Sequence, residues 1–529
     1  MESNSLSETA HPEGEEKIHS PFQEKTTGNA PPLMSVDTEG GRYHVQWDDS
    51  APMTPLGQLV FFAQFLHAGG RWEDFCSEAP FGFTSPNAPS HEDVLGSLAL
   101  SILCGHTRYA HVNALRFDTV TPPMLGMHKV VSEDSARRNL KKLDQIGARH
   151  WQAKHLRATW ERLLSEPWML DIDTTVKTVF GRQEGAEVGY NPHKPGRPSH
   201  SYHTYWIARL RLCLDVEVRP GNQNSASHGM PGLWELIDSL PHSLRPHAIR
   251  GDCNYGSQGV MAECEARGIP YLFKLRQTAK VKTLIAALEQ KGGWVYCGQG
   301  FEGIEGELQL TGWNCKRRVI VGRRRIQTGG AEEEKNALPL LSQCGELPME
   351  LVSYEYIVLV TTMPYETPAL VALYRERGDA ENPFDELKNQ WGWAGFTTQD
   401  LDRCQVTARL IAQIYNWWSL YARLVDRERH REAVTTRPEL LGGVARQTRH
   451  AGQTRISVNL SHSKGNRIKS QLAEASAFLQ NILTTAEQLT NAQRWERILL
   501  RIFEKFIKPT LLNTCQWFAP KRSLRIFAE

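Results

Sequence analysis

Between residues 168 and 275 the sequence changes from strand-like runs to alternating strand and helix signals, and this order constrains the fold strongly. Residues 168–180 and 204–215 are rich in β-branched and aromatic residues, which is typical of β-strands. The segments that follow predict a helix, a strand, a helix and a strand, over residues 232–240, 248–256, 258–267 and 271–275. Strands followed by alternating strands and helices predict an α/β domain with a mixed sheet.

The regions around this segment complete the predicted architecture. Residues 292 to about 330 show β-type alternation with Gly-rich turns, and apolar β-type sequence returns at residues 356–361. We interpret residues 280–352 as a β-rich insertion that separates two parts of one core, residues 166–279 and 353–420. The flanking regions are predicted to be helical, over residues 41–165 and 421–529.

The formal net charge of +2 conceals a strong asymmetry along the chain. Residues 1–50 contain 10 acidic and 3 basic side chains, a balance of −7, whereas residues 401–529 contain 10 acidic and 21 basic side chains, a balance of +11. The basic C-terminal region favours a polyanionic partner. Residues 1–40 are rich in Ser, Glu, Gly and Pro, and they predict a disordered acidic tail.

The cysteines and the apolar runs indicate the compartment. The 10 Cys residues are scattered, with no C-x-x-C pair, a pattern that argues against a zinc finger and against a disulfide scaffold. The first residues lack the basic and apolar regions of a secretory signal. No run approaches the roughly 18 apolar residues that a membrane span needs. We therefore expect a soluble, cytoplasmic protein with no membrane partner.

A basic helix is predicted after Ser132, a residue that suits a helix N-cap. Four basic residues lie on or just after this helix: Arg137, Arg138, Lys141 and Lys142. Short helices joined by tight turns, the last of them basic, are typical of a helix-turn-helix DNA-binding region. We therefore predict that residues 41–165 bind DNA, with an ordinary basic solvated helix as the alternative.

Two aspartates lie where α/β sheets place their chemistry. Asp173 lies in the middle of the first predicted strand, and Asp252 ends a short apolar strand, at the kind of sheet edge where sites form. A carboxylate in an apolar strand is costly unless it is paired or binds a metal. Asp171 lies two residues before Asp173 and would face the same side of a strand, so it competes for the same role.

A third acid lies on a predicted helix within residues 374–388. Arg377 lies four residues before Glu381, Tyr374 lies seven before it and Lys388 seven after it, so the four side chains share one helix face. Charge spacing alone also fits a solvated helix with ordinary Arg–Glu pairs. Together with the two strand aspartates, however, Glu381 could hold two Mg²⁺ ions about 4 Å apart, an arrangement that serves phosphoryl transfer.

Other catalytic motifs are absent from the sequence. It contains no Walker loop, no G-x-S-x-G elbow and no H-E-x-x-H helix. His200 and His203 have no metal-ligand spacing with another His or Cys, so we interpret them as loop or DNA-contact residues. The acids at 173, 252 and 381 therefore carry the catalytic hypothesis.

These motifs resemble those of the DDE transposases of bacterial insertion sequences. Tyr374, Arg377, Glu381 and Lys388 fit in full the family signature of Tyr, two residues, Arg, three residues, Glu, six residues and Lys. Asp-Thr-Thr at 173–175 and the strand-end Asp at 252 match the two Asp motifs in the right order. Further segments resemble the insertion-sequence-1380 group, over residues 105–109, 115–118, 179–185, 189–192 and 196–198.

The resemblance, which spans about residues 50–420, implies a ribonuclease-H-like core and DNA transposition by end cleavage and strand transfer. It implies that Asp173, Asp252 and Glu381 bind two Mg²⁺ ions, with Mn²⁺ as an alternative. The Tyr, Arg and Lys of the signature would hold terminal phosphates. The implied partners are terminal inverted repeats and target DNA, bound by a homodimer in a bacterial, nucleoid-associated setting.

The resemblance also implies that an aromatic residue of the insertion stacks on a flipped base. Trp313, Tyr356 and Trp294 are the candidates, and each is also suited to the core. Two other functions remain open in the sequence. One is a catalytically idle, transposase-derived DNA-binding protein, and the other is a ribonuclease-H-like nuclease without strand transfer.

Pro383 bears on how the third acid is presented. It lies two residues after Glu381 and predicts that the helix restarts at an Asn382 cap, so that Glu381 would lie at the helix edge. The other acids of this segment are alternatives for the third position, although they miss the family spacing: Asp379, Asp385 and Glu386.

Overall fold

The computed structural model describes residues 33–165, 167–326, 353–427, 430–460 and 462–518, with side chains left out at 208, 379–382 and 505–518. The chain divides into two compact units, Met1–Ala51 and Pro52–Glu529. In the first unit, β1 (Met34–Thr38) and β2 (Gly41–Val45) form an exposed antiparallel hairpin. The predicted disordered tail, residues 1–40, thus overlaps a strand at its end, where Arg42 pairs with Asp37 across the turn at 2.8 and 3.0 Å.

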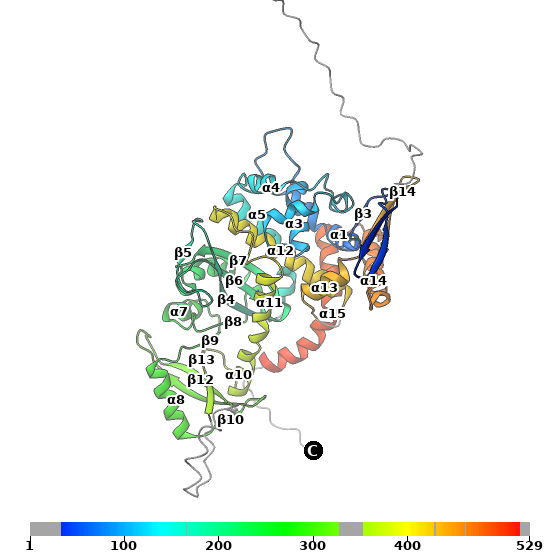
Figure 1. Ribbon diagram of the computed structural model, residues 1–529. Helices are drawn as coiled ribbons and strands as arrows, with labels where there is room; N and C mark the ends of the chain where they lie inside the picture. The colour runs from blue at the N-terminus through cyan, green and yellow to red at the C-terminus, as the bar shows by residue number, and fades with distance from the viewer. Residues whose placement is uncertain (1–32, 166, 327–352, 428–429, 461, 519–529) are drawn as a thin grey trace, which may run out of the picture. The chain divides into compact units, whose positions relative to one another are not determined.

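The centre of the second unit is the sheet that the sequence predicts. Strands β4, β6 and β7 are antiparallel neighbours, and β8 and β9 continue the sheet on the other side of β4 as parallel strands. The order β7-β6-β4-β8-β9 is the ribonuclease-H-like arrangement, so the predicted fold class is confirmed (Figure 1). The strand bounds are β4 Met169–Thr178, β5 Glu187–Val188, β6 Pro198–Ile207, β7 Leu212–Pro220, β8 Ala248–Gly251 and β9 Tyr271–Lys274.

The prediction of one strand over residues 204–215 is wrong. The structure places a turn there, η4 (Ala208–Leu210), followed by Arg211 with φ 50°. The apolar run continues through this turn because β6 and β7 are both buried, so composition alone does not reveal the reversal. The interpretation of His200 and His203 as loop residues is also wrong, because both are buried within β6.

Strand β13, which follows the predicted β-rich insertion, and three strands within that insertion extend the same sheet. Strand β13 pairs antiparallel with β9, and β12, β11 and β10 follow in order, giving ten strands within the described residues. The bounds of this part are α8 Ala279–Lys291, β10 Val295–Tyr296, β11 Phe301–Leu308, β12 Arg317–Ile326 and β13 Ser353–Thr361. Residues 327–352 of the predicted insertion lie outside the described residues.

The two faces of the sheet are covered by different elements. Helix α10 (Thr367–Arg375) packs on one face, where Leu370 joins Met169, Ala248 and Leu272 in one buried cluster. Because side chains alternate along a strand, residues two and four positions after Met169 face α10 as well. The other face is covered by the helices that connect the core strands, namely α6 (Met230–Asp238) and α7 (Gln258–Ala266).

The helical regions predicted before and after the core pack around one long helix. Helix α12 (Leu401–Val425) is buried over most of its length and contacts β7 and helices from both ends of the chain. The other helices are α1 Leu59–Ala68, α2 Arg71–Ser77, α3 His91–Leu103, α4 Glu133–Leu140, α5 Gln145–Trp160, α11 Gly378–Asn389, α13 Ala433–Leu440, α14 Gly465–Thr484 and α15 Asn491–Phe518. Short helical turns are η1 Tyr109–Leu115, η2 Pro122–Leu125, η3 Glu161–Ser165, η5 Ser225–Gly229 and η6 His242–Leu244.

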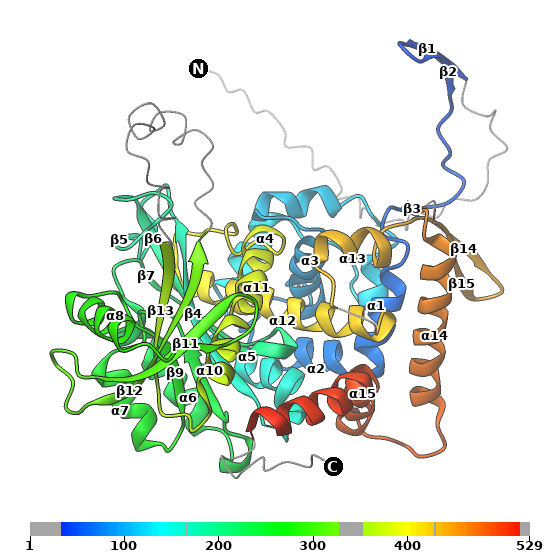
Figure 2. The same ribbon diagram turned by 90° about the horizontal axis from the view of Figure 1, so that it is seen from below.

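The expectation that residues 421–529 are helical misses one element. Strands β14 (Val444–His450) and β15 (Gln453–Asn459) form a hairpin, and β14 also pairs with β3 (Met53–Thr54). The hairpin is visible beside α14 in Figure 2. Its strands are mostly polar and basic, and its turn is Ala451-Gly452 rather than the stronger Asn-Gly signal, so sequence alternation indicates it weakly. Within the described residues, every helix is too short or too polar to cross a membrane.

Candidate active site

Asp173 and Asp252 lie side by side on neighbouring parallel strands. The last residue pair between β4 and β8 is Ile172 with Gly251, and the two aspartates are the next residue on each strand. Adjacent strands are about 4.8 Å apart. The two carboxylates that the sequence singled out, 79 positions apart in the chain, therefore belong to one site.

Each of these carboxylates is held by hydrogen bonds. Asp173 accepts from Arg377 Nη2 at 2.7 Å and from the Thr174 amide at 2.7 Å. Asp252 accepts from the amide of Asn254 at 2.9 Å and from its side-chain Nδ2 at 3.1 Å. Asp173 keeps 21% of its side-chain area exposed, so the site is open to a ligand.

Asp171, which competes with Asp173 in the sequence, has a different role. It is buried and accepts two hydrogen bonds from Arg250, at 2.6 and 2.7 Å. Arg250 also donates to the Leu373 carbonyl near the end of α10. The pair therefore fastens the end of α10 to the sheet beside Asp173, and Asp173 is the more exposed of the two aspartates.

The predicted restart of the helix at Asn382 is wrong. The structure ends α10 at Arg375 and begins α11 at Gly378, and Pro383 lies inside α11. The link is a tight turn in which the Arg377 amide donates to the Tyr374 carbonyl at 3.0 Å. Proline fits the helical φ and removes only one backbone hydrogen bond here. The buried residues that follow it, Phe384 and Leu387, keep the helix packed.

This turn aims Arg377 at the two aspartates. Tyr374 is buried at the end of α10, and Glu381 has its backbone in α11. The side chain of Glu381 lies outside the described residues, as does that of Asp379. The structure therefore brings Tyr374 and Arg377 to the two aspartates, while the convergence of the third acid stays a prediction.

The charge of Arg377 interacts with the carboxylates on β4 and with Asp252. Burial alone would lower the pKa of Arg377, but the nearby charges of Asp173, Tyr374, Asp171 and Asp252 raise it above its usual range. Burial raises the pKa of Tyr374 to about 12, and the charge of Asp252 adds to this shift. Several side chains thus sense the same negative potential at the ends of β4 and β8.

A hydrogen-bonded network lies on the opposite face of the sheet from these carboxylates. Thr174 Oγ1 is 3.1 Å from His203 Nδ1 and 3.1 Å from the Tyr255 hydroxyl. The charges of Asp173 and Asp252 add to the burial that raises the pKa of Tyr255. Sequence reasoning missed the role of His203, because its position opposite Thr174 depends on strand register.

The remaining predicted residues of the Glu helix lie in different environments. Lys388 is half-buried on α11 and has no side-chain hydrogen bond within the described part of the chain. Glu386, an alternative third acid, is buried and accepts from Trp391 Nε1 at 3.1 Å and from the Ala433 amide at 2.9 Å. It therefore holds the start of α13. Asp385 is exposed and accepts from Asn389 at 2.6 Å.

The basic residues of α4 form a separate surface. Arg137 pairs with Glu133 at 3.1 Å and Asp134 at 2.8 Å. The other three are exposed: Arg138, Lys141 and Lys142. Among the described contacts, none joins these side chains to the aspartates of the sheet, so their role in DNA binding remains a prediction.

The three aromatic candidates are all engaged in packing. Trp313 is 8% exposed, with the Arg317 guanidinium 5.4 Å from its ring centre. Tyr356 is half-buried and donates to Glu289 at 2.9 Å. Arg323 lies 4.0 Å from the ring centre of Trp294. None of these contacts separates the three as base-stacking residues.

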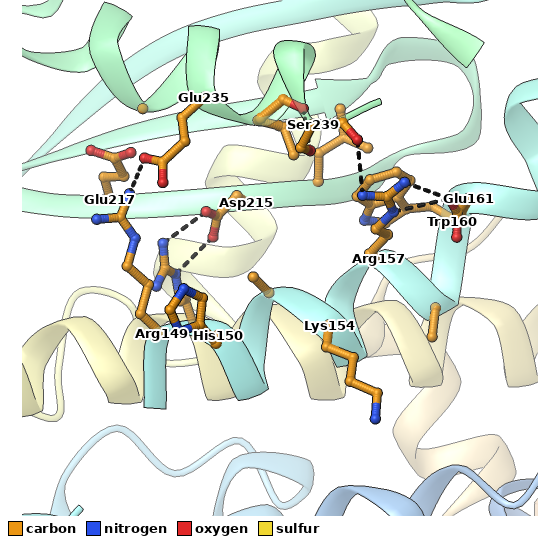
Figure 3. A pocket seen from close by; sticks show the side chains of 16 residues that line it. Arg149, His150, Lys154, Arg157, Trp160, Glu161, Asp215, Glu217, Glu235 and Ser239 are labelled. Atoms are coloured by element: carbon orange, nitrogen blue, oxygen red, sulfur yellow. Dashed lines mark hydrogen bonds and ion pairs between the residues drawn. The ribbon is translucent and has the colours of Figure 1, made fainter. Parts of the chain in front are cut away.

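A cavity of about 540 Å³ lies elsewhere, between α5, α6, β7 and α12 (Figure 3). Its carboxylates are neutralised by arginines: Asp215 by Arg409 at 2.8 Å, Glu161 by Arg157 at 2.6 Å, Glu217 by Arg219 at 2.6 Å, and Glu235 by Arg149. Among the side chains that the structure describes, no group of three or more His, Cys, Asp or Glu forms a metal-binding cluster.

Comparison with known proteins gives one informative match. The family described as Transposase DDE domain group 1 matches residues 87–482, a span that contains Asp173, Asp252 and Glu381. A cryo-EM structure of a piggyBac transposase synaptic complex with hairpin DNA is among the similar solved structures, with a TM-score of 0.36, 10% identity and coverage of 85% of each chain. A likeness at that level carries no argument about activity. No curated protein matches the chain.

Proposed function

Because the chain belongs to the Transposase DDE domain group 1 family, we propose that it cleaves DNA at the ends of a mobile element and joins the freed strand to target DNA. The observation that carries this proposal is the placement of Asp173 and Asp252 at adjacent positions of β4 and β8, beside Arg377. The signature from Tyr374 to Lys388 further favours the bacterial insertion-sequence-1380 group. Terminal inverted repeats would be bound by a homodimer.

The donor set fits a hard divalent cation. Both aspartates offer carboxylate oxygens, which Mg²⁺ prefers, and the negative potential at this edge raises the pKa of Arg377. Asp173, Asp252 and Glu381 would hold two Mg²⁺ ions, with Mn²⁺ as a substitute. Bound ions would lower the pKa of the attacking water or 3′-hydroxyl and neutralise charge on the leaving oxygen.

The chain's own groups would bind and orient the DNA. The Arg377 guanidinium, 2.7 Å from Asp173, lies where it can also hold a phosphate next to the scissile bond. The Tyr374 hydroxyl keeps its proton at neutral pH, because burial raises its pKa to about 12, and it can donate to a phosphate oxygen. Lys388 would add a second positive charge along α11. The phosphodiester would thereby be held beside the two aspartates while water, and then the 3′-hydroxyl, attacks in line.

Conservative substitutions test this proposal. Full-length Asp173→Asn and Asp252→Asn should lose Mg²⁺-dependent cleavage of a labelled duplex carrying the terminal inverted repeat by at least about 10²-fold, because each loses one carboxylate charge at the reacting centre. Both variants should still bind the duplex in a fluorescence anisotropy titration. The matched control is Asp385→Asn, which removes an exposed carboxylate from α11 and should cleave at the wild-type rate.

The products separate the alternatives. Cleavage that persists in both sheet variants would refute the assigned site. Cleavage by the wild-type protein without joining to a target plasmid would indicate a nuclease, and binding without either reaction would indicate an idle DNA-binding protein.

A further inference from the structure

The hairpin of β14 and β15 is a regular and exposed ribbon. Its residues pair continuously from Val444 with Asn459 to His450 with Gln453. The two-residue turn places both Ala451 and Gly452 at positive φ, 50° and 77°, which matches the twist of a tight hairpin. One end of β14 is anchored to β3, where Ala445 is fully buried opposite Thr54. The far end of the ribbon carries polar side chains, and Figure 2 shows the ribbon beside α14.

This ribbon is basic on both of its faces. Arg455 lies opposite Thr448 on one face, and Arg449 lies opposite Thr454 on the other, and both arginines are exposed. Neither takes part in a salt bridge among the residues that the structure describes, whereas Lys464 beyond the ribbon pairs with Glu439 at 3.3 Å. His450 is exposed at the turn. The tip therefore presents an arginine and a threonine on each face of the ribbon.

The ribbon itself contains no acid. Residues 444–459 contain no Asp or Glu, although they contain three Arg residues. An exposed edge rich in Arg is protected against pairing with another strand. It is also what a protein needs for contacts with phosphates.

We propose that the β14–β15 hairpin is a DNA-binding ribbon, separate from the catalytic aspartates, whose tip lies in a groove of duplex DNA. The major groove, about 12 Å wide, admits a two-stranded ribbon. Arginines on opposite faces of the ribbon can then reach the phosphates on the two sides of the groove. The inference extends the proposed function, since it adds a contact that holds duplex DNA while the acids act.

Removing the two tip charges tests the ribbon. We expect full-length Arg449→Ala/Arg455→Ala to bind a 30-base-pair duplex carrying the inverted repeat about 10- to 100-fold more weakly near 0.1 M salt, and its salt slope to fall by about 1.8, since each lost phosphate contact contributes roughly 0.9. Anisotropy titrations over several salt concentrations give both quantities without metal. The matched control is Lys280→Ala/Lys282→Ala, which removes two exposed charges from α8. Thermal melting checks that both proteins are folded, and Arg449→Gln/Arg455→Gln repeats the test if the alanine variant is not.

Each outcome decides the proposal. A weaker, less salt-dependent complex for the ribbon variant alone supports it. Equal affinity for the wild-type protein and the ribbon variant overturns it, as does an equal loss in the α8 control. A wild-type protein that binds no duplex overturns it too. If the wild-type protein binds duplex DNA through the ribbon but does not cleave it, the proposed function fails while the ribbon stands.

Discussion

Asp171 and Asp173 are two positions apart on one face of β4, yet their surroundings give them opposite roles. Asp171 is 1% exposed and shares two hydrogen bonds with an Arg250 that is equally buried. Asp173 is partly open and lies among like charges beside Arg377. The sequence predicted that both face the same side, but it could not show that Arg250 neutralises only the first.

This contrast predicts different stabilities. Asp171→Asn should lower the free energy of unfolding by about 3–5 kcal/mol, because it leaves the Arg250 charge buried without its partner. Asp173→Asn should lower the free energy of unfolding much less. Arg377 still has the negative charges of Asp171 and Asp252 nearby, and the substitution removes one carboxylate that repels them. Urea unfolding followed by circular dichroism measures both. A larger loss for Asp173→Asn than for Asp171→Asn would contradict the assignment.

His203 should make stability depend on pH. Burial lowers its pKa to about 4, whereas the unfolded value is near 6.5, so the unfolded chain binds the proton first as pH falls. The contribution of the neutral His203 imidazole to the free energy of unfolding is therefore complete above about pH 6.5 and is lost as pH falls towards 4. Across that window, the stability of the wild-type protein should fall by roughly 3 kcal/mol more than that of His203→Gln.

Unfolding midpoints measured from pH 7 to pH 4 give this difference. The control is His193→Gln, which changes an exposed histidine and should follow the wild-type curve. Parallel curves for the wild-type protein and His203→Gln would show that the buried imidazole is not responsible.

Among the elements, the helix that was predicted from its N-cap agrees with the structure. The helix predicted after Ser132 begins at Glu133, and the Ser132 side chain accepts from the Ser135 amide as an N-cap should. The sequence places the helix break at Asn382 and Pro383, whereas the structure has it at Glu376 and Arg377. Proline is the stronger signal for a break in a sequence. Packing of Phe384 and Leu387 outweighs the proline, and the sequence does not show that packing.

The edge of the sheet at β7 is closed by side chains of α12. Asn416 accepts from the Cys213 amide at 2.9 Å and donates to the Cys213 carbonyl at 2.8 Å. Gln405 accepts from the Val218 amide at 2.6 Å and donates to the Val216 carbonyl at 2.8 Å. These amides satisfy backbone groups that an edge strand would otherwise leave open.

Asn416→Ala should therefore lower the free energy of unfolding by about 2–5 kcal/mol, because it leaves buried backbone groups of Cys213 without partners. The control is Ser419→Ala on the same helix, where the buried hydroxyl has no hydrogen-bond partner among the described residues, so its loss should cost little. Urea unfolding compares the two. Equal stability of both variants would show that α12 does not support the edge of the sheet.

In the molecule as a whole, the sequence predicted a mixed sheet in the core, and it singled out Asp173 and Asp252, which the structure places at adjacent positions of neighbouring strands. Short-range patterns suffice for strands such as β4 and β8, and the positions of Asp173 within one strand and Asp252 at the end of the other singled out these two residues. Patterns within a segment do not reveal which strands become neighbours across the chain. That β12 pairs with β13, and β13 with β9, depends on contacts between distant segments, and so does the position of His203 opposite Thr174.

The site itself depends on this long-range assembly, since β4, β8 and α11 lie far apart in the sequence. The affinity for Mn²⁺ tests the proposed metal site most directly. It is measured by electron paramagnetic resonance in the presence of the inverted-repeat duplex. The wild-type protein and Asp385→Asn should bind the ion alike, whereas Asp252→Asn and Glu381→Gln should each lose tight binding, because each removes one ligand of the shared site. Unchanged Mn²⁺ binding in Asp252→Asn or in Glu381→Gln would contradict a metal site built from these acids.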